Sequence, residues 1–268
     1  MATSAPSASG LDRGALPTIE QLTALARERR SIRGYQRDRD VPDELIRQII
    51  EVARWAPSGG NGQPWEFIII RDAAMRARIA DLFLKQQAEK KEMELAIRGT
   101  IRMTGAGFRD APVYIVVVGD PRVNESYPVR TREDKGERHF ITGLANATLL
   151  LHLAAASLGL ASQYVSDVGS PYMATMLRAW LGIPDPLRVY ELVPIGWPLR
   201  QPQPTPRRPL DDLIHRERYD LAKQRDWASV EQFLQSQTRR GAYGKSQRQA
   251  IADQGMLFEA APAEPEAE

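Results

Sequence analysis

The sequence contains no cysteine and only three histidines. Without cysteine the chain has no disulfides, no thiolate nucleophile and no cysteine-based zinc or iron–sulfur site. The histidines, His139, His152 and His215, are scattered, and none has metal-ligand spacing to another histidine or to a pair of carboxylates. We therefore predict no metal site, and we expect His152 to lie in the core or in a subunit interface with its ring hydrogen-bonded.

An excess of either charge is also missing. The 36 lysines and arginines nearly balance the 34 aspartates and glutamates, which leaves a formal net charge of +2. Such a chain lacks the broad basic field of a nucleic-acid-binding protein. We expect no nucleic-acid partner, and any anion site has to be local.

Charged residues are absent between Phe140 and Ser166. This stretch is long enough to cross a membrane, but several polar residues interrupt it. A buried helix over residues 141–158, followed by a strand, explains the pattern better, so no membrane partner is expected. The first ten residues, MATSAPSASG, lack the basic start and apolar core of a secretory signal. We expect a flexible leader over residues 1–17 and a cytoplasmic protein.

The remaining pattern mixes helices of unequal length with short apolar strands. This is typical of one α+β domain with a mixed sheet flanked by helices. We expect the domain to span residues 18–220, a helical extension to cover 221–243, and a disordered tail to cover 244–268.

Individual elements follow from hydrophobic periodicity and from end signals. Strands are predicted at residues 66–72, 113–120, 160–167 and 189–198, and the continuous apolar run of the first favours a central place in the sheet. Helices are predicted to begin at Thr18 and Pro42, and to cover residues 73–98 and 170–184 with Gly182 near the C-terminal cap. The charged stretch KQQAEKKEME is expected to be a solvated helix face, and residues 121–139 a loop.

The first candidate site is the cluster RERRSIR at residues 27–33. Arg29, Arg30 and Arg33 surround Ser31. Clustered guanidinium groups beside a hydroxyl suit a phosphate, because arginine offers a planar fork of donors. The alternative is that these cations only complement the dipole at a helix C-terminus.

The second candidate is the stretch APSGGNGQPW at residues 56–65. Gly59 and its neighbouring glycines allow the backbone to approach a flat ligand closely. Asn61 and Gln63 can donate and accept in one plane, as the edge of a heterocycle requires. The alternative is a tight loop with local side-chain caps. The stretch is not a dinucleotide fingerprint, because it precedes a strand, and no lysine follows its glycines as in a phosphate-binding loop.

The third candidate is the pair Arg207 and Arg208, at the end of the proline-rich segment RQPQPTPRRP. The prolines favour an extended arm over a packed element. Such an arm can carry two cations to a distant anion, and the alternative is a basic pair that only aids solubility. A chain without its own nucleophile or metal site, but with segments suited to a phosphate and a heterocycle, points to an organic cofactor that carries the chemistry.

The order of these segments resembles a known family. RRSIRGY…VPDELIRQIIEVARWAPSGGNGQPWEFIII resembles the N-terminal signature of the nitroreductase family of flavin enzymes. The segments DAPVYIVV, SQYVSD, LRAWLGIPDPLRVYELVPIGWP and RRPLDDLIHRERYD continue the resemblance in order, over about residues 22–220. The resemblance implies a sandwich around a mixed sheet, with FMN held at the interface of a homodimer. It also implies that the C-terminal arm of one subunit wraps onto the other.

The resemblance also implies roles for individual residues. Arg29 and Ser31 would contact the phosphate and ribityl end of FMN, with Arg30 beside the ribityl chain, and Arg33 would stabilise the reduced flavin from the pyrimidine side. Further contacts would come from the partner subunit, from the segment Tyr164–Asp167 and from the arm. The residues concerned are Pro57, Ser58, Gly59, Asn61, Gln63, Val165, Ser166, Arg207 and Arg208. In that set, Val165 and Ser166 belong to the segment near flavin N5, and Arg207 and Arg208 return to the phosphate.

The chain departs from the family pattern before the second strand. Several members carry an Asn and a Lys there that contact the flavin ring, and those places hold Thr104 and Gly107 in this sequence. Arg102 and Arg109 are the nearby cations, and the resemblance does not say whether either of them substitutes. The polar partner of the flavin pyrimidine therefore stays open.

Three functions fit these observations. The first is an FMN-dependent oxidoreductase that takes hydride from NADH or NADPH and reduces a nitroaromatic, a quinone or a similar small-molecule acceptor in a ping-pong cycle. The second is related flavin chemistry, namely oxygen-dependent flavin fragmentation, reductive dehalogenation or dehydrogenation, with residues 85–108 and 122–138 deciding the reaction. The third is a non-catalytic flavin-binding or partner-binding protein that uses the extension beyond Tyr219. Apart from Arg33, no side chain is assigned a catalytic role.

Overall fold

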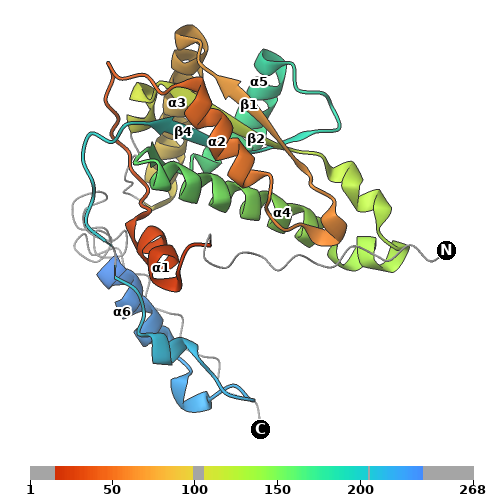
Figure 1. Cartoon of the computed structure of the whole chain (residues 1–268), viewed down its shortest axis with the longest axis vertical. Helices are drawn as coiled ribbons and strands as arrows, with labels where there is room; N and C mark the ends of the chain where they lie inside the picture. The colour runs from red at the N-terminus through yellow and green to blue at the C-terminus, as the bar shows by residue number, and fades with distance from the viewer. Residues whose placement is uncertain (1–15, 99–105, 205, 238–268) are drawn as a thin grey trace, which may run out of the picture.

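The computed structural model describes residues 16–98, 106–204 and 206–237. Within these ranges, helices lie on both sides of a single sheet (Figure 1). The α-helices are α1 (Ile19–Glu28), α2 (Asp43–Ala53), α3 (Ala73–Arg98), α4 (Val129–Ser157), α5 (Pro171–Leu181) and α6 (Trp227–Gln237). The strands are β1 (Trp65–Ile70), β2 (Val113–Gly119), β3 (Ala161–Ser162) and β4 (Arg188–Gly196).

The strands lie in the order β1-β2-β4-β3, and all three pairings between them are antiparallel. The expected mixed sheet is therefore corrected: among the described residues its parallel component is one isolated bridge, between Ser31 and Ser162. The third strand is also shorter than predicted. The chain leaves the sheet soon after Ser162 and turns into the short helix η5 (Ser166–Gly169).

β1 lies at the edge of the sheet, so the prediction of a central position is wrong. Its continuous apolar run is typical of a strand buried on both faces. In the structure only Trp65 and Ile70 of this strand are buried, and Ile69 is 44% exposed. The apolar run predicted a strand correctly here, but the place of a strand in the sheet depends on which other segments pair with it.

Two hydrophobic cores occupy the two faces of the sheet. β2 is buried along its whole length, and its alternate residues point to opposite faces. Val116 packs in one core with Phe83 of α3 and Leu177 of α5. Val117 packs in the other core, which includes Leu144 of α4 and the buried side of α2. This is the helix-flanked α+β sandwich that the sequence predicts.

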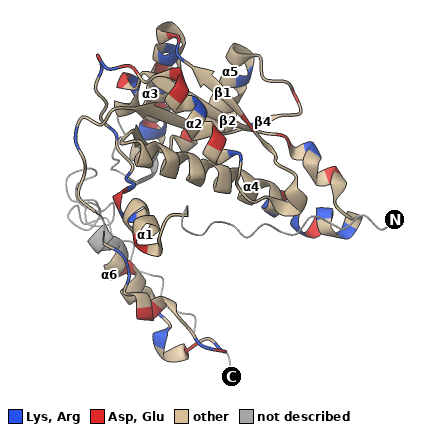
Figure 2. Ribbon diagram, in the orientation of Figure 1, with Lys and Arg blue, Asp and Glu red and all other residues tan. Residues whose placement is uncertain are grey.

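α4 contains the charge-free segment and is longer than expected. It begins at Val129, so the prediction of a loop over residues 121–139 is wrong for its second half, and residues 121–126 form the short helix η4 (Pro121–Ser126). Charged residues of both signs lie on the first turns of α4 and none on the rest (Figure 2). By length and composition α4 could cross a membrane, but half of its most apolar stretch is buried inside the structure. Its buried residues, such as Leu151, belong to the core against the sheet.

Local signals set two helix ends as predicted. Thr18 and Gln21 exchange both bonds of a capping box: Gln21 N donates to Thr18 Oγ1 at 3.2 Å, and Thr18 N donates to Gln21 Oε1 at 2.9 Å. Gly182 follows α5 with a φ of 65°, in the left-handed region where a β-carbon is unfavourable. Both ends depend on residues close together in sequence.

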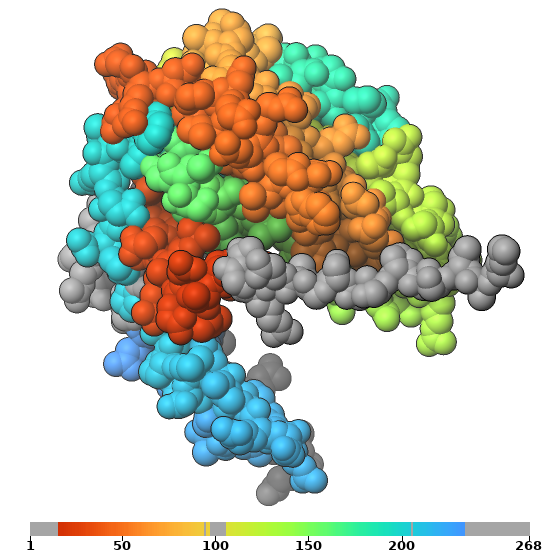
Figure 3. All heavy atoms as spheres, viewed as in Figure 1, coloured from red at the N-terminus to blue at the C-terminus, as the bar shows by residue number. Residues whose placement is uncertain are grey.

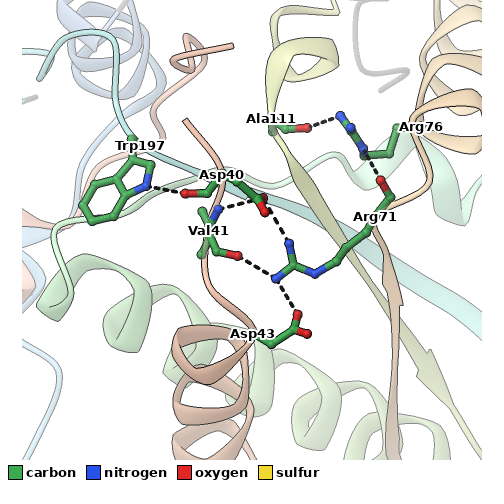
Figure 4. A network of polar contacts seen from close by, with 7 residues as sticks. All are labelled: Asp40, Val41, Asp43, Arg71, Arg76, Ala111 and Trp197. Atoms are coloured by element: carbon green, nitrogen blue, oxygen red, sulfur yellow. Dashed lines mark hydrogen bonds and ion pairs between the residues drawn. The ribbon is translucent and has the colours of Figure 1, made fainter. Parts of the chain in front are cut away.

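An arginine just after β1 ties the segment before α2 to the sheet (Figure 4). Arg71 Nη1 lies 3.1 Å from Asp40 Oδ1, and its Nη2 lies 2.6 Å from both Val41 O and Asp43 Oδ1. Trp197, just after β4, donates its Nε1 to Asp40 O at 3.0 Å. These contacts fix the path of the chain where it leaves the arginine cluster.

Beyond β4 the chain forms an arm. Residues 200–204 and 206–209 have no helix or strand, as the prolines predict, and Gln201 Nε2 donates to Glu28 O at 3.1 Å. The part of the arm that ends in α6 projects away from the body of the protein (Figure 3). The predicted extension from residue 221 becomes a regular helix only at Trp227. The predicted tail over residues 244–268 lies outside the described residues, as does most of the predicted leader, so the domain boundaries stay predictions.

Candidate functional site

A cavity of about 610 Å³ opens beside the segment that follows β3. It is lined by Arg33, by the rings of Phe83 and Phe108, and by most of the run from Gln163 to Ser170. Of the residues predicted from sequence, the cavity joins Arg33 to Val165 and Ser166, although these lie far apart in the chain.

Backbone pairing holds the arginine cluster against β3. Ile32 N donates to Ser162 O at 3.0 Å, next to the bridge that joins Ser31 to Ser162. On the other side, Leu199 N donates to Gly34 O at 3.0 Å. The cluster therefore pairs with the edge of the sheet beside the cavity, and of its arginines Arg33 lines the cavity.

Arg29 and Arg30 lie where α1 ends. Arg29 is the C-terminal cap of the helix, and Arg30 Nη1 donates to Arg29 O at 3.0 Å. The Nε of Arg30 is buried and has no hydrogen-bond partner within the described part of the chain. A buried guanidinium N–H without a partner is what a bound anion satisfies, whereas a role limited to the helix dipole would leave it solvated.

Ser166 stands on the cavity wall with a buried carboxyl behind it. Ser166 Oγ donates to Glu191 Oε2 at 2.8 Å, and Leu192 N donates to Glu191 Oε1 at 3.2 Å. Glu191 is 4% exposed. Burial raises the pKa of Glu191 to about 7, the hydrogen bonds from Ser166 and the backbone oppose the rise, and the nearby Asp167 carboxylate adds to it. Sequence reasoning missed Glu191, and the available signal was a single glutamate inside the apolar run VYELVPIG.

Side chains of α3 reach the same wall. Gln86 Nε2 donates to Ser170 Oγ at 2.6 Å, Gln87 Nε2 donates to Asp167 Oδ2 at 2.8 Å, and Lys90 forms an ion pair with Asp167. Gln86 is buried. The prediction that this stretch of α3 is a solvated face is therefore wrong for these residues, because one side of the helix packs on η5.

Aromatic and amide groups complete the lining. Phe83 and Phe108 meet edge to face, with ring centroids 5.1 Å apart. Gln163 is 6% exposed, and its Oε1 has no hydrogen-bond partner within the described part of the chain. The cavity lining thus combines apolar side chains with three polar residues, Gln163, Ser166 and Arg33. Apolar walls with a few placed polar groups are typical of a small-molecule site.

His152 lies in the core, as predicted, at the back of this region. Its Nδ1 lies 2.8 Å from Ser162 Oγ, and its ring centroid is 4.2 Å from that of Tyr164. The other ring nitrogen, Nε2, is buried and has no partner within the described residues. Burial, with a smaller effect from Arg29, lowers the pKa of His152 to about 3, so the ring is neutral at physiological pH.

The glycine-rich loop lies apart from the cavity. Tyr127 Oη donates to Gly59 O at 2.6 Å, and Asn146 Nδ2 donates to Pro57 O at 2.9 Å. Asn146, which contacts the loop, and His152, which contacts the cavity-lining Tyr164, are both on α4. The helical rise places them about 9 Å apart along the axis, so the loop and the cavity lie at different points along the helix. None of Pro57, Ser58, Gly59, Asn61 and Gln63 lines the cavity of its own chain.

The loop nevertheless has a defined shape. Gly60 has a φ of 56°. Asn61 and Gln63 have φ values of 54° and 47°, which are unusual for residues with side chains. Gln63 N donates to Ser58 Oγ at 3.0 Å, and Gln63 Nε2 lies 3.4 Å from Asn61 O. Trp65, which closes the loop, is buried in the core with α2 and α4, as an anchor for β1.

Arg207 and Arg208 also lie apart from the cavity. Arg207 Nη1 donates to Pro206 O at 3.1 Å, and Arg208 Nη2 donates to Asp212 O at 3.2 Å. Neither lines the cavity of its own chain. The single chain therefore assembles the arginine cluster with Val165 and Ser166, but not with the loop or the arm.

The difference from the family pattern before β2 has a steric explanation at Gly107. A β-carbon on Gly107 would lie 2.3 Å from Arg33 O, so no side chain fits at this position. Arg109 forms an ion pair with Asp81 of α3 instead of lining the cavity. Thr104 and Arg102 lie outside the described residues.

Comparison with known proteins agrees with this architecture. The model of the Nitroreductase family matches residues 26–197, and the chain therefore belongs to the Nitroreductase family, a family of oxidoreductases. The arm and α6 lie beyond the match.

Similar proteins differ in their reactions. The NADH dehydrogenase of Thermus thermophilus is 29% identical over 211 residues, which cover 74% of this chain and 97% of that protein. The 5,6-dimethylbenzimidazole synthase of Rhodospirillum rubrum is 28% identical over 200 residues, or 70% of this chain and 93% of that protein. A solved structure of oxidized iodotyrosine deiodinase bound to FMN and 3-iodo-L-tyrosine has the same fold, with a TM-score of 0.58 and 23% identity, over 74% of this chain and 100% of that one.

Proposed function

We propose that this chain is an FMN-dependent oxidoreductase that takes electrons from NADH or NADPH and reduces a nitroaromatic, a quinone or a similar acceptor. One observation carries the proposal: the cavity joins Arg33 to Val165 and Ser166 within a member of the Nitroreductase family. The family resemblance assigns these residues to one flavin, and the fold brings them to one place.

The residues present fit a flavin. A cavity of about 610 Å³ is within the usual range for small-molecule sites. Phe83 and Phe108 offer apolar contact to a flat ring. Gln163 Oε1 and Arg30 Nε are buried polar atoms without a partner in the described chain. A ring edge that donates a hydrogen bond would satisfy Gln163, and a phosphate would satisfy Arg30.

The chain would hold the cofactor and tune it by charge. Bound FMN would supply the redox chemistry, accepting hydride from NAD(P)H and giving it to an acceptor that binds after the nicotinamide leaves. Arg33 places a cation at the cavity, which stabilises a ligand that gains negative charge on reduction. Arg29, Arg30 and Ser31 would hold the phosphate and ribityl end, where the cluster pairs with β3.

A homodimer would complete the site. The loop and the arm do not reach the cavity of their own chain, so a second copy would have to bring Ser58, Gly59 and Arg208 to it. α1 has no buried residue, and Ile19 on it is 69% exposed. On the arm Leu221 is 76% exposed. Apolar side chains left uncovered on α1 and on the arm suit burial against a second subunit.

Related flavin chemistry is the second candidate. The likeness to a 5,6-dimethylbenzimidazole synthase, and the shared fold with a deiodinase, favour reactions other than nitro or quinone reduction. Gln86 and Lys90 of α3 contact the cavity wall, so this part of α3 is placed to select the acceptor.

Steady-state turnover separates these functions. The purified protein should be yellow, and NADH or NADPH should bleach it without oxygen. We expect fast turnover with a quinone or a nitroaromatic acceptor. Slow loss of flavin in oxygen with negligible quinone turnover would favour the fragmentation reaction instead. A colourless protein that does not take up added FMN would refute both.

A further inference from the structure

Ser166 lies between a buried carboxyl and the open cavity. Ser166 is one of the residues that line the cavity, and its Oγ donates to Glu191 Oε2 at 2.8 Å. Glu191 is closed off from solvent by the sheet and by η5, and its second oxygen accepts from Leu192 N at 3.2 Å. Among the side chains of the described residues, the Ser166 hydroxyl links this carboxyl to the cavity lining by a hydrogen bond.

A hydroxyl has one proton to donate and two lone pairs that accept. When Glu191 is ionised, it accepts the proton of Ser166, and Ser166 then faces the cavity with a lone pair. When Glu191 is protonated, the carboxyl O–H can donate to Ser166 Oγ, and the Ser166 proton becomes free to point into the cavity. The protonation of one buried group thus changes the sign of the hydrogen bond that the wall offers to a ligand.

The surroundings of Glu191 allow both forms near neutral pH. Five elements pack on β4: β2, β3, α4, α5 and η5. Among the described residues, the ionisable groups that act on Glu191 or are acted on by it are Asp167 on η5 and the phenols of Tyr164 and Tyr190. Asp167 is paired with Lys90 of α3, and burial raises the pKa of both phenols, so they stay neutral. Between Phe140 and Ser157, α4 has no charged residue.

We propose that Glu191 is a positioning residue that decides whether Ser166 donates or accepts a hydrogen bond in the cavity. Ser166 itself is the residue that touches the ligand. The inference rests on the proposed function only in naming FMN as that ligand. A ligand atom that accepts a hydrogen bond favours protonated Glu191, and one that donates favours the ionised form. By linkage, the redox state of a bound flavin and the charge of Glu191 are then coupled.

The first test needs no flavin. Infrared absorbance of protonated carboxyl groups is titrated from about pH 5 to pH 9 in the FMN-free protein, and the Glu191→Gln spectrum is subtracted. We expect one carboxyl to lose its proton with a midpoint near pH 7. Asp167→Asn should lower the midpoint, because a like charge is removed. Ser166→Ala should raise it by about one pH unit, because the carboxylate loses a hydrogen-bond donor.

Matched variants guard against a purely structural effect. Ser166→Thr keeps the hydroxyl and should restore the wild-type midpoint. Glu137→Gln, which removes an exposed carboxyl paired with Arg188, should leave the titration unchanged. A Glu191 that stays ionised over the whole pH range, or a midpoint that Ser166→Ala does not move, would overturn the inference.

The second test measures the absorption spectrum of bound, oxidised FMN as a function of pH, because this spectrum responds to hydrogen bonds in the cavity. In the wild type the spectrum should shift with the same midpoint as the carboxyl. Glu191→Gln should hold the low-pH spectrum at every pH, because the amide N–H₂ donates to Ser166 as a protonated carboxyl does. Ser166→Ala should abolish the shift while the infrared titration persists. A shift that survives in Glu191→Gln contradicts the proposal. A wild type that binds no FMN contradicts the proposed function, and the infrared titration still decides on the coupling of Ser166 to Glu191.

Discussion

Gly107 lies so close to the main chain of Arg33 that a β-carbon added to it would come within 2.3 Å of the Arg33 carbonyl oxygen. The next residue, Phe108, is buried and lines the cavity. The contact therefore sets the position of Arg33 relative to one wall of the cavity. It also leaves no room for a side chain at position 107.

Gly107→Ala should weaken FMN binding. The methyl group cannot be accommodated without moving the backbone of Arg33, and overpacking of this kind costs about 1–3 kcal/mol. We expect the Kd for FMN, measured by flavin fluorescence, to rise by roughly 10-fold or more. Gly34→Ala is the matched control, because its new β-carbon would meet Leu199 at an ordinary 3.5 Å. Wild-type affinity in Gly107→Ala would show that the Arg33 backbone does not matter for the cofactor.

Tyr127→Phe should loosen the glycine-rich loop. The Tyr127 hydroxyl donates to Gly59 O at 2.6 Å, and its ring meets His139 edge to face at 5.3 Å. Loss of one such hydrogen bond lowers the free energy of unfolding by about 1 kcal/mol. Urea unfolding measures this change in the free energy of unfolding. Tyr172→Phe is the control, because Tyr172 on α5 is exposed. If the loop serves the partner's flavin, Tyr127→Phe should also weaken FMN binding in the dimer.

Acid should destabilise the protein through His152. Burial lowers the pKa of this histidine to about 3, well below its value in an unfolded chain. Because the folded pKa is the lower one, the stabilising contribution is complete above about pH 6.5 and is lost as the pH falls toward 3. Between pH 6.5 and pH 5 the loss is about 2 kcal/mol.

Urea unfolding at these two pH values, in wild type and in His152→Gln, checks this expectation. Glu191 acts in the opposite direction, because its raised pKa makes it most stabilising below about pH 4.5 and least so above pH 7. Comparison with His152→Gln removes this second effect, since both proteins contain Glu191. Equal pH dependence in the two proteins would mean that His152 is protonated in the folded state.

Arg71→Met should release the segment before α2. The guanidinium contacts two carboxylates and Val41 O, and its side chain is 30% exposed (Figure 4). Truncation leaves the Val41 carbonyl without its donor, and we expect a loss of about 1–3 kcal/mol in the free energy of unfolding. Arg130→Met is the control, because this arginine on α4 is 94% exposed and should not affect stability. Similar unfolding curves for the two variants would exclude a structural role for the network.

Short-range features of the fold were readable from the sequence. The capping box at Thr18, the glycine cap at Gly182 and the extended arm follow from residues that act within a few positions of themselves. The Arg29, Arg30, Ser31 and Arg33 cluster was visible for the same reason, since its members are neighbours in the chain. The order of the motifs was specific enough to indicate the family that the family match confirmed.

Three features could not be predicted from the sequence: the edge position of β1, the helical start of α4, and the contacts of Gln86 and Lys90 with η5. Each depends on which distant segment supplies hydrogen bonds or cover, and an apolar or charged run has the same pattern in either setting. Glu191 is the clearest case. Its sequence context predicted only a strand residue, but tertiary packing removed it from water and placed it behind Ser166. The sequence alone therefore determined most of the helices and strands, their order along the chain and the arginine cluster. Only the tertiary structure decided that Arg33 and Ser166 line one cavity, with Glu191 buried behind Ser166. Burial and long-range pairing arise from the packing of segments that are far apart in the chain.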